Sequence, residues 1–184
     1  DELTGQLNRI RLTDALGAVM ARSTKTGQSA SFLVVAVNNL AIINETFGFE
    51  VGDEVLAATA RIIRSRLRGG DTIGRYSSNK FGIILNECGP GAMRIASERF
   101  MKSVREATIT TTACQLSATI SVGGVLLPDQ AGNANEVLSH ALRALDRAKE
   151  KRFDCFMSYE PTPHKESARQ RNIAIADEVI AALD

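Results

Sequence analysis

The sequence predicts an α/β domain in which helices flank a mixed central sheet. Apolar residues recur at helical spacing in several segments, and these segments alternate with short apolar runs of strand length. Hydrophobic residues make up 44% of the 184 residues, which is enough for the core of one domain with an extra terminal element.

The first half of the chain alternates helical patterns with one buried strand. The continuous apolar run Phe32–Val37 is typical of a central strand that is buried on both faces. Gly69 and Gly70 are expected to end the helix before them, because glycine suits helix C-termini. The expected helices are Leu3–Arg22, Ala41–Phe47 and Val51–Leu67.

The second half predicts a hairpin followed by further helices and strands. The turn 77–80 is expected to join the two strands of the hairpin. Asn133 and Glu136 are spaced as a capping box, so we expect a helix to begin there. The expected strands are Thr72–Tyr76, Phe81–Leu85, Ile109–Cys114, Leu116–Leu127 and Cys155–Tyr159, and the other helices are Pro90–Arg105 and Lys165–Leu183.

The balance of charged residues argues against two classes of partner. The 22 basic and 21 acidic side chains give a net charge of +1, which favours neither nucleic acid nor an anionic membrane. No apolar run is long enough to cross a bilayer and no signal peptide is visible, so we expect a cytoplasmic protein. Three widely spaced cysteines indicate free thiols, and two histidines argue against a histidine-based metal site.

Five segments carry motifs in a specific order and spacing, namely Asp1–Arg9, Phe32–Leu56, Arg75–Phe81, Thr119–Gly123 and Ala144–Arg152. Together they resemble the GGDEF domains of bacterial diguanylate cyclases. The resemblance covers residues 1–159 and implies a palm-like, nucleotide-cyclase-type α/β fold with a ferredoxin-like core. It also implies a place in cyclic di-GMP signalling, because the family joins two GTP molecules into cyclic di-GMP.

The resemblance implies that the catalytic carboxylates have been replaced. Cyclase chemistry needs two divalent cations, and Mg²⁺ prefers carboxylate oxygens. The matching positions carry Ala36, Asn38, Asn79 and Lys80, which offer no anionic oxygen and add one positive charge. We therefore predict a catalytically inactive domain with no metal site and no cofactor, to which Mg²⁺ and GTP would bind only if residual affinity persists.

Two further departures weaken the phosphate site that the resemblance implies. Ser77–Ser78 replaces two hairpin glycines, and the added Cβ atoms restrict the backbone, although such a hairpin is also an ordinary surface turn. Ala41 replaces the lysine after the first strand, and Phe153 replaces the arginine after the last helix, although Arg152 lies beside it. Lys149 is retained, either as a phosphate ligand or as a solvated helix residue.

The pair that reads guanine in the family is retained in Asn44 and Asp53. An aspartate can accept hydrogen bonds from guanine N1 and N2, and an asparagine can both donate and accept. The same residues also suit a helix cap and a helix first turn, so two interpretations stay open. The first interpretation allows metal-independent binding of a guanine nucleotide.

Arg68 and Asp71 match the family's RxxD product-inhibition motif, just before the hairpin. An arginine there can stack on guanine and pair with phosphate or with the Hoogsteen edge, which makes cyclic di-GMP a candidate ligand. The alternative is a surface Arg–Asp pair at the end of a helix.

Residues 160–184 follow the domain and resemble the connector that leads into an EAL phosphodiesterase domain. The residues that carry this likeness are Tyr159–Pro161, Arg169, Arg171 and Asp177–Leu183. We expect a connector helix whose EAL domain, an intramolecular partner, is absent from this chain. The alternative is a C-terminal helix that ends the protein or makes a homodimer contact.

Three functional interpretations follow. The leading one is a silent GGDEF domain with a regulatory or interaction role, in a GGDEF–EAL protein whose own activity would be that of a cyclic di-GMP phosphodiesterase. The second is an active diguanylate cyclase with non-standard metal ligands, for which Glu45 and Glu54 are candidates. The third is an unrelated ferredoxin-like binding domain, which would lack the long hairpin.

Overall fold

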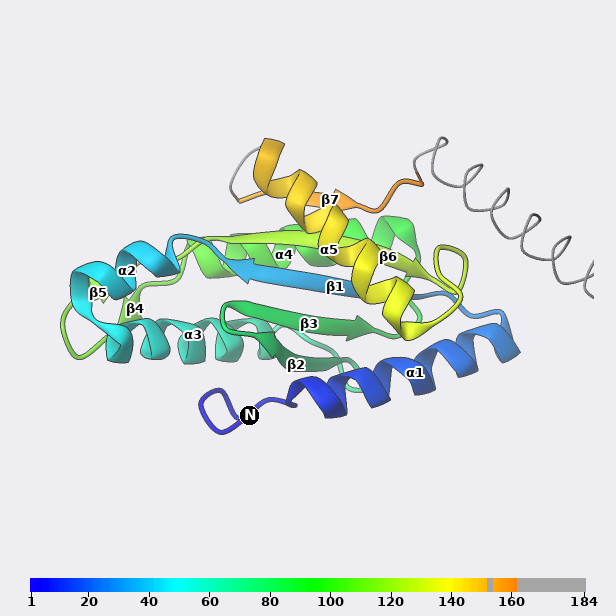
Figure 1. Ribbon diagram of the computed structural model, residues 1–184, viewed down its shortest axis with the longest axis horizontal. Helices are drawn as coiled ribbons and strands as arrows, with labels where there is room; N and C mark the ends of the chain where they lie inside the picture. The colour runs from blue at the N-terminus through cyan, green and yellow to red at the C-terminus, as the bar shows by residue number, and fades with distance from the viewer. Residues whose placement is uncertain (152–153, 162–184) are drawn as a thin grey trace, which may run out of the picture.

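The computed structural model describes residues 1–151 and 154–161 as helices around a central sheet (Figure 1). The helices are α1 (Arg9–Thr26), α2 (Leu40–Phe47), α3 (Phe49–Arg64), α4 (Pro90–Arg105) and α5 (Ala134–Lys151). The strands are β1 (Ala30–Val37), β2 (Thr72–Ser77), β3 (Lys80–Leu85), β4 (Ile109–Thr110), β5 (Gln115–Leu116), β6 (Ile120–Leu127) and β7 (Phe156–Ser158). This arrangement confirms the predicted α/β class with a mixed central sheet flanked by helices.

The central sheet has the strand order β2-β3-β1-β6-β7, and β4 pairs with β5 in a separate two-stranded sheet. β1 runs antiparallel to both β3 and β6, whereas β7 runs parallel to β6, which makes the sheet mixed. All eight residues of β1 are buried, which confirms the predicted central strand. The hairpin β2–β3 is present, and its existence contradicts the interpretation as a ferredoxin-like domain without one.

Helices cover both faces of the sheet. Successive residues of β1 point to opposite faces, so β1 contributes to an apolar cluster on each side. The odd-numbered residues 33–37 join the apolar cluster formed by α2, α3 and α4. The even-numbered residues 32–36 join the cluster formed by α1 and α5. Figure 1 shows α5 crossing the near side of the strands with α4 behind them.

The first helix is shorter at its start than the periodicity predicted. The expected start at Leu3 was wrong, because the side chain of Asn8 accepts a hydrogen bond from Arg11 N (3.0 Å) and caps α1. The preceding residues form a turn in which Thr4 N and Thr4 Oγ1 donate to Asp1 Oδ1 (3.0 and 2.8 Å). The helix continues beyond the expected Arg22 to Thr26, where Gly27 adopts a positive φ of 70°.

The helix α3 ends at Arg64, so the expected end at Gly69 and Gly70 was also wrong. The residues that follow form a turn around the carboxylate of Asp71, which accepts hydrogen bonds from Arg68 N (3.1 Å) and Asn86 N (3.0 Å). Gly70 takes a positive φ of 97° within this turn. Its conformational freedom serves the turn into β2 instead of a helix cap.

The strand expected at 109–114 is instead a small hairpin. Thr111 N donates to Cys114 O (3.0 Å), which folds the chain back after β4 and leaves only two residues in each arm. Leu116 therefore belongs to β5, and β6 begins four residues later at Ile120. Periodicity could not reveal this hairpin, because arms of two residues are too short to show an alternating pattern.

Other predicted elements are confirmed with small shifts. The helix α4 has the predicted bounds, and Glu136 N donates to Asn133 Oδ1 (3.0 Å) at the predicted cap of α5. The helix expected at 165–183 and the connector after residue 161 lie outside the described residues. Among the helices of the described part, none has both the length and the apolar character needed to cross a membrane.

Candidate functional site

The predicted replacement positions meet where the end of β1 lies beside the β2–β3 hairpin. Ala36 is fully buried and pairs with Lys80 across the β1–β3 ladder. Asn79 fastens the hairpin to β1, because Val37 N donates to its backbone carbonyl (3.0 Å) and its Nδ2 donates to Val37 O (3.4 Å). Lys80 Nζ in turn lies 3.5 Å from Asn79 Oδ1. Both polar atoms of the Asn79 side chain thus have partners within the protein.

Asn38 is used for structure. It is 3% exposed, its Nδ2 donates to Thr119 Oγ1, and its Oδ1 accepts from Ser121 Oγ, each at 3.1 Å. These two hydrogen bonds join the end of β1 to the start of β6. The second strand-end position therefore holds the sheet together and has no free oxygen for a ligand.

Replacing Asn38 with alanine is expected to lower the free energy of unfolding by about 1–3 kcal/mol, because it leaves the buried hydroxyl of Ser121 and the half-buried hydroxyl of Thr119 without their partner. Urea denaturation measures the loss. The exposed Gln115 provides a control, since Gln115→Ala is expected to change stability by less than about 0.5 kcal/mol. Equal effects of the two substitutions would contradict the assigned role of Asn38.

Lys149, on the last turn of α5, brings a second positive charge to the hairpin. Burial lowers the pKa of Lys149, and the ammonium group of Lys80 lowers it further, against the opposing effect of Asp146. The effect of Lys80 on this pKa indicates that the two ammonium groups lie near each other. Two positive charges therefore stand where the family binds cations.

The residues at this edge do not fit Mg²⁺. Within residues 1–151 and 154–161, no three histidine, cysteine, aspartate or glutamate side chains come together as a group that could hold a metal ion. Ala36 supplies no side-chain oxygen, and the amides of Asn38 and Asn79 are already hydrogen-bonded. A hard dication prefers several carboxylate oxygens, which this donor set lacks.

The proposed substitute ligands do not repair this site. Glu54 accepts hydrogen bonds from Thr112 N (2.7 Å) and Thr112 Oγ1 (2.8 Å), which bind its carboxylate to the turn between β4 and β5. Glu45 is exposed on α2. These contacts give no support to the interpretation as a cyclase with non-standard ligands.

Asn44 packs against Gly52, the residue before Asp53, where α2 packs on α3. A Cβ added to Gly52 would lie 3.0 Å from Asn44 Cγ and closer still to its Oδ1, so the missing side chain makes room for this amide. Asn44 Oδ1 is buried and has no hydrogen-bond partner among the described residues. Asp53, the residue after Gly52, is exposed.

The alternative structural roles of this pair are wrong. Asn39, not Asn44, is the N-cap of α2, and the side chain of Asn44 makes no capping hydrogen bond. The acidic residue in the first turn of α3 is Glu50, because the helix begins at Phe49. The buried, unpartnered acceptor on Asn44 suits a ligand that donates N–H groups.

Arg68 and Asp71 line two neighbouring cavities, one between the α3–β2 turn and α4 and the other between that turn and the end of α1. One has a volume of about 120 Å³ and includes Cys88 and Arg99 in its wall, and the other has about 440 Å³ and includes Arg22. Asp71 is only 8% exposed and its carboxylate is occupied by backbone N–H groups, so it shapes the turn. The expected surface Arg–Asp ion pair is absent between these two described residues.

Arg99 is a functional candidate that the sequence reasoning missed. It comes from α4, its Nε is buried without a hydrogen-bond partner among the described residues, and its guanidinium lies 5.5 Å from the ring centroid of Phe100. No short motif marks this arginine. Only the packing of α4 beside the turn at Arg68 reveals that two guanidinium groups share one cavity.

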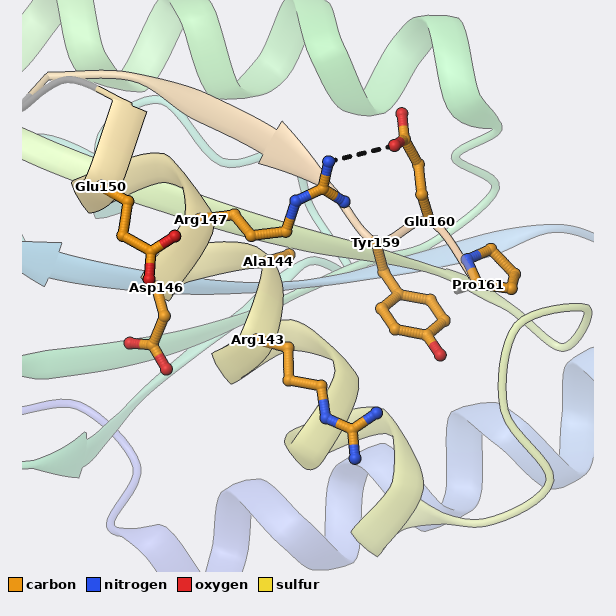
Figure 2. Close-up of a pocket in the computed structure, with 8 residues that line it drawn as sticks. All are labelled: Arg143, Ala144, Asp146, Arg147, Glu150, Tyr159, Glu160 and Pro161. Carbon is orange, nitrogen blue, oxygen red and sulfur yellow. Dashed lines mark hydrogen bonds and ion pairs between the residues drawn. The ribbon is translucent and has the colours of Figure 1, made fainter. Parts of the chain in front are cut away.

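A further cavity of about 560 Å³ lies between α5 and the chain that leaves β7 (Figure 2). Arg147 Nη2 donates to Glu160 Oε2 (3.2 Å) across it, and Tyr159 stacks on His140 with ring centroids 3.9 Å apart. Its walls are Arg143, Ala144, Asp146, Arg147, Glu150, Tyr159, Glu160 and Pro161. Neither Lys80 nor Lys149 lines it, so it is separate from the hairpin edge.

The mixed sheet, the flanking helices and the β2–β3 hairpin define an α/β domain of the nucleotide-cyclase type. Residues 1–155 match the family model described as "Diguanylate cyclase, GGDEF domain". The chain therefore belongs to the GGDEF domain family, as its motifs predicted. The position expected for the phosphate-binding arginine, Phe153 with neighbouring Arg152, lies outside the described residues.

The chain is similar to parts of longer proteins. Diguanylate cyclase A of Treponema denticola is 32% identical over 123 residues, which cover 67% of this chain and 33% of that protein. The cyclic di-GMP phosphodiesterase NbdA of Pseudomonas aeruginosa is 27% identical over 81% of this chain and 19% of its own length. The solved structure of the diguanylate cyclase SiaD with its activator SiaC, from the same species, is 30% identical with a TM-score of 0.81 over 86% of this chain and 60% of that one.

Proposed function

We propose that this chain is a catalytically silent GGDEF domain with a regulatory role in cyclic di-GMP signalling. The observation that carries the proposal is the chemistry of the hairpin edge. Ala36, Asn79 and Lys80 stand where the family uses carboxylates, and Lys149 adds a second ammonium group. The arrangement repels the dications on which the family's reaction depends.

The size of the expected rate loss supports an inactive domain over a slow enzyme. Losing the charge stabilisation of two metal ions removes several kcal/mol from the transition state, and about 1.36 kcal/mol corresponds to a tenfold change in rate. A loss of about 4 kcal/mol already corresponds to roughly a thousandfold. Asn38 and Glu54, the other polar candidates, are held by internal hydrogen bonds.

The regulatory ligand that we propose is cyclic di-GMP, bound across the two neighbouring cavities that Arg68 lines, with Arg99 in the wall of the smaller one. A guanidinium group can stack on a guanine base and can donate two parallel hydrogen bonds to phosphate or to the Hoogsteen edge. The unpartnered Nε of Arg99 supports this assignment, because a buried donor without a partner is costly unless a ligand accepts from it.

We also propose that the silent domain belongs to a GGDEF–EAL protein and that residues 160–184 connect the two domains. The chain spans only a third or less of the two curated relatives described above, one of which is a phosphodiesterase. The exit of the chain is fastened to the domain, because Gln130 Nε2 donates to Tyr159 O (3.2 Å) and Arg147 pairs with Glu160. These contacts would transmit a change in the domain to whatever follows it.

Two measurements test the proposal. Incubation with GTP and Mg²⁺ or Mn²⁺, followed by chromatography, is expected to yield no cyclic di-GMP. Calorimetric titration with cyclic di-GMP is expected to show binding that Arg68→Ala and Arg99→Ala each weaken about tenfold or more, because each removes a charge-assisted hydrogen bond. Arg94→Ala, on the exposed side of α4, is the matched control and should leave the affinity unchanged.

The outcomes separate the two parts of the proposal. Appreciable formation of cyclic dinucleotide would contradict silence. Unchanged affinity in Arg68→Ala and Arg99→Ala would contradict the assigned cavity, and failure to bind either cyclic di-GMP or GTP at millimolar concentration would leave only a scaffold role.

A further inference from the structure

We propose that the hairpin edge binds the phosphate chain of a guanine nucleotide directly, without a divalent cation, and that Lys80 takes the place of the metal ions. The inference rests on the proposed function, because only a site that has given up metal-dependent catalysis can carry this substitution. It assigns to Lys80 a ligand-binding role that the family pattern does not contain.

The position of Lys80 supports this role. It begins β3 directly opposite Ala36 of β1, so its side chain starts beside the strand end where the family binds cations. Within the described part of the chain, its one side-chain polar contact is the long one to Asn79 Oδ1 (3.5 Å), and Asn79 is itself hydrogen-bonded to Val37. An ammonium group with a single long contact is thus attached to a hairpin that two hydrogen bonds between Asn79 and Val37 hold to β1.

The charge around Lys80 also favours an anion. Lys149 lies close enough to feel its charge, and neither lysine forms an ion pair within residues 1–151 and 154–161. Two ammonium groups near each other are mutually destabilising, and an anion placed between them relieves the repulsion. Phosphate groups match this need, because lysine binds them as a point charge and requires no particular geometry.

The guanine end of the ligand is supported by an independent observation. Asn44 lies on α2, which begins three residues after β1 ends, and its buried Oδ1 has no partner among the described residues. Gly52 leaves this oxygen the space that any side chain would fill. The N1–H and N2–H groups of guanine are donors that would satisfy such an acceptor, with Asp53 beside it.

Mg²⁺ should oppose this binding. A nucleotide that carries Mg²⁺ has less negative charge for the two lysines to attract, and the ion would lie next to Lys80 with no carboxylate to hold it. Mg²⁺ is therefore expected to weaken nucleotide binding at this site, which is the opposite of the metal dependence that a cyclase site shows.

The test is calorimetric titration of the whole chain with GTP, GMP and inorganic tripolyphosphate, each in EDTA and again in millimolar Mg²⁺. GTP is expected to bind in EDTA, more tightly than GMP or tripolyphosphate, and more weakly once Mg²⁺ is present. Lys80→Ala is expected to weaken GTP binding about tenfold, and Lys80→Gln by a similar factor, since each removes one charge-assisted hydrogen bond. Lys102→Ala is the control, because Lys102 is an exposed lysine of α4 paired with Glu106.

Three outcomes would overturn the inference. These are GTP binding that requires Mg²⁺, GTP binding that is unchanged in both Lys80 variants, and no GTP binding in either condition. Circular dichroism confirms that the variants are folded, and Lys80→Gln keeps the length of the side chain should the alanine variant unfold. None of these outcomes would contradict the proposed lack of catalytic activity, which product formation tests. Nor would they contradict the assignment of the Arg68–Arg99 cavity, which titration with cyclic di-GMP tests.

Discussion

Returning three carboxylates to the hairpin edge is expected to create a Mn²⁺ site that the natural chain lacks. The variant combines Ala36→Asp, Asn79→Glu and Lys80→Glu. We expect its affinity for Mn²⁺ to exceed that of the natural chain by about a hundredfold or more, which corresponds to about 2.7 kcal/mol. Calorimetry or the loss of the free Mn²⁺ signal in electron paramagnetic resonance measures the difference.

The expected gain follows from the charges alone. At a separation of about 4 Å and an effective dielectric constant of about 20, one pair of unit charges interacts by about 4 kcal/mol. Lys80→Glu changes the local charge by two units, and the other two substitutions add one negative charge each. Even after generous discounting for desolvation, the sum exceeds the energy needed for a hundredfold change.

A stability measurement provides an independent readout of the same variant. Ala36 is fully buried beneath α5, so an aspartate placed there without a cation is expected to lower the melting temperature in EDTA. Mn²⁺ should restore much of the loss, because a ligand that binds only the folded state stabilises it.

The matched control replaces the same three positions with uncharged side chains, as Ala36→Asn, Asn79→Gln and Lys80→Gln. This neutral variant has nearly the same volume and should bind no Mn²⁺. Equal Mn²⁺ binding by the two variants, or none by the carboxylate variant, would show that charge at these positions is not what separates this chain from a metal-binding site.

How far the sequence could predict this molecule depended on which interaction fixed each feature. The buried strand β1 and the helix α4 were predictable, because continuous or periodic apolar residues determine them. The start of α1 and the turn after α3 were not, because single polar groups shape them, namely the side chain of Asn8 and the carboxylate of Asp71. Local hydrogen bonds of this kind leave no trace in hydrophobic periodicity.

The candidate site shows the same division. The loss of carboxylates at positions 36 and 79 could be seen in the sequence, because it depends only on residue type. The internal use of Asn38, the unpartnered oxygen of Asn44 and the presence of Arg99 beside Arg68 could not. Each depends on a contact between segments that lie far apart in the chain or on the packing of two helices.

Adding one methyl group at Gly123 is expected to destabilise the domain by about 3 kcal/mol or more, near the upper end of the cost of overpacking a core. Gly123 lies in β6, between β1 and β7, directly beneath α5. A Cβ at this position would lie 2.8 Å from Leu145 Cα and closer still to the backbone of Ala141 and Leu145. These are helix backbone atoms, so no side-chain rotation can relieve the clash.

Gly17→Ala is the matched control, because a Cβ on that residue of α1 meets open space among the described residues. Alanine is a better helix former than glycine, so this control should gain up to about 1 kcal/mol. Urea denaturation of both variants gives the comparison, and a loss at Gly123 no larger than about 1 kcal/mol would contradict the close contact. Because α5 carries Lys149, lifting the helix should also weaken GTP binding in Gly123→Ala, under conditions in which the variant remains folded. Gly123 would then set the distance between the two lysines of the hairpin edge.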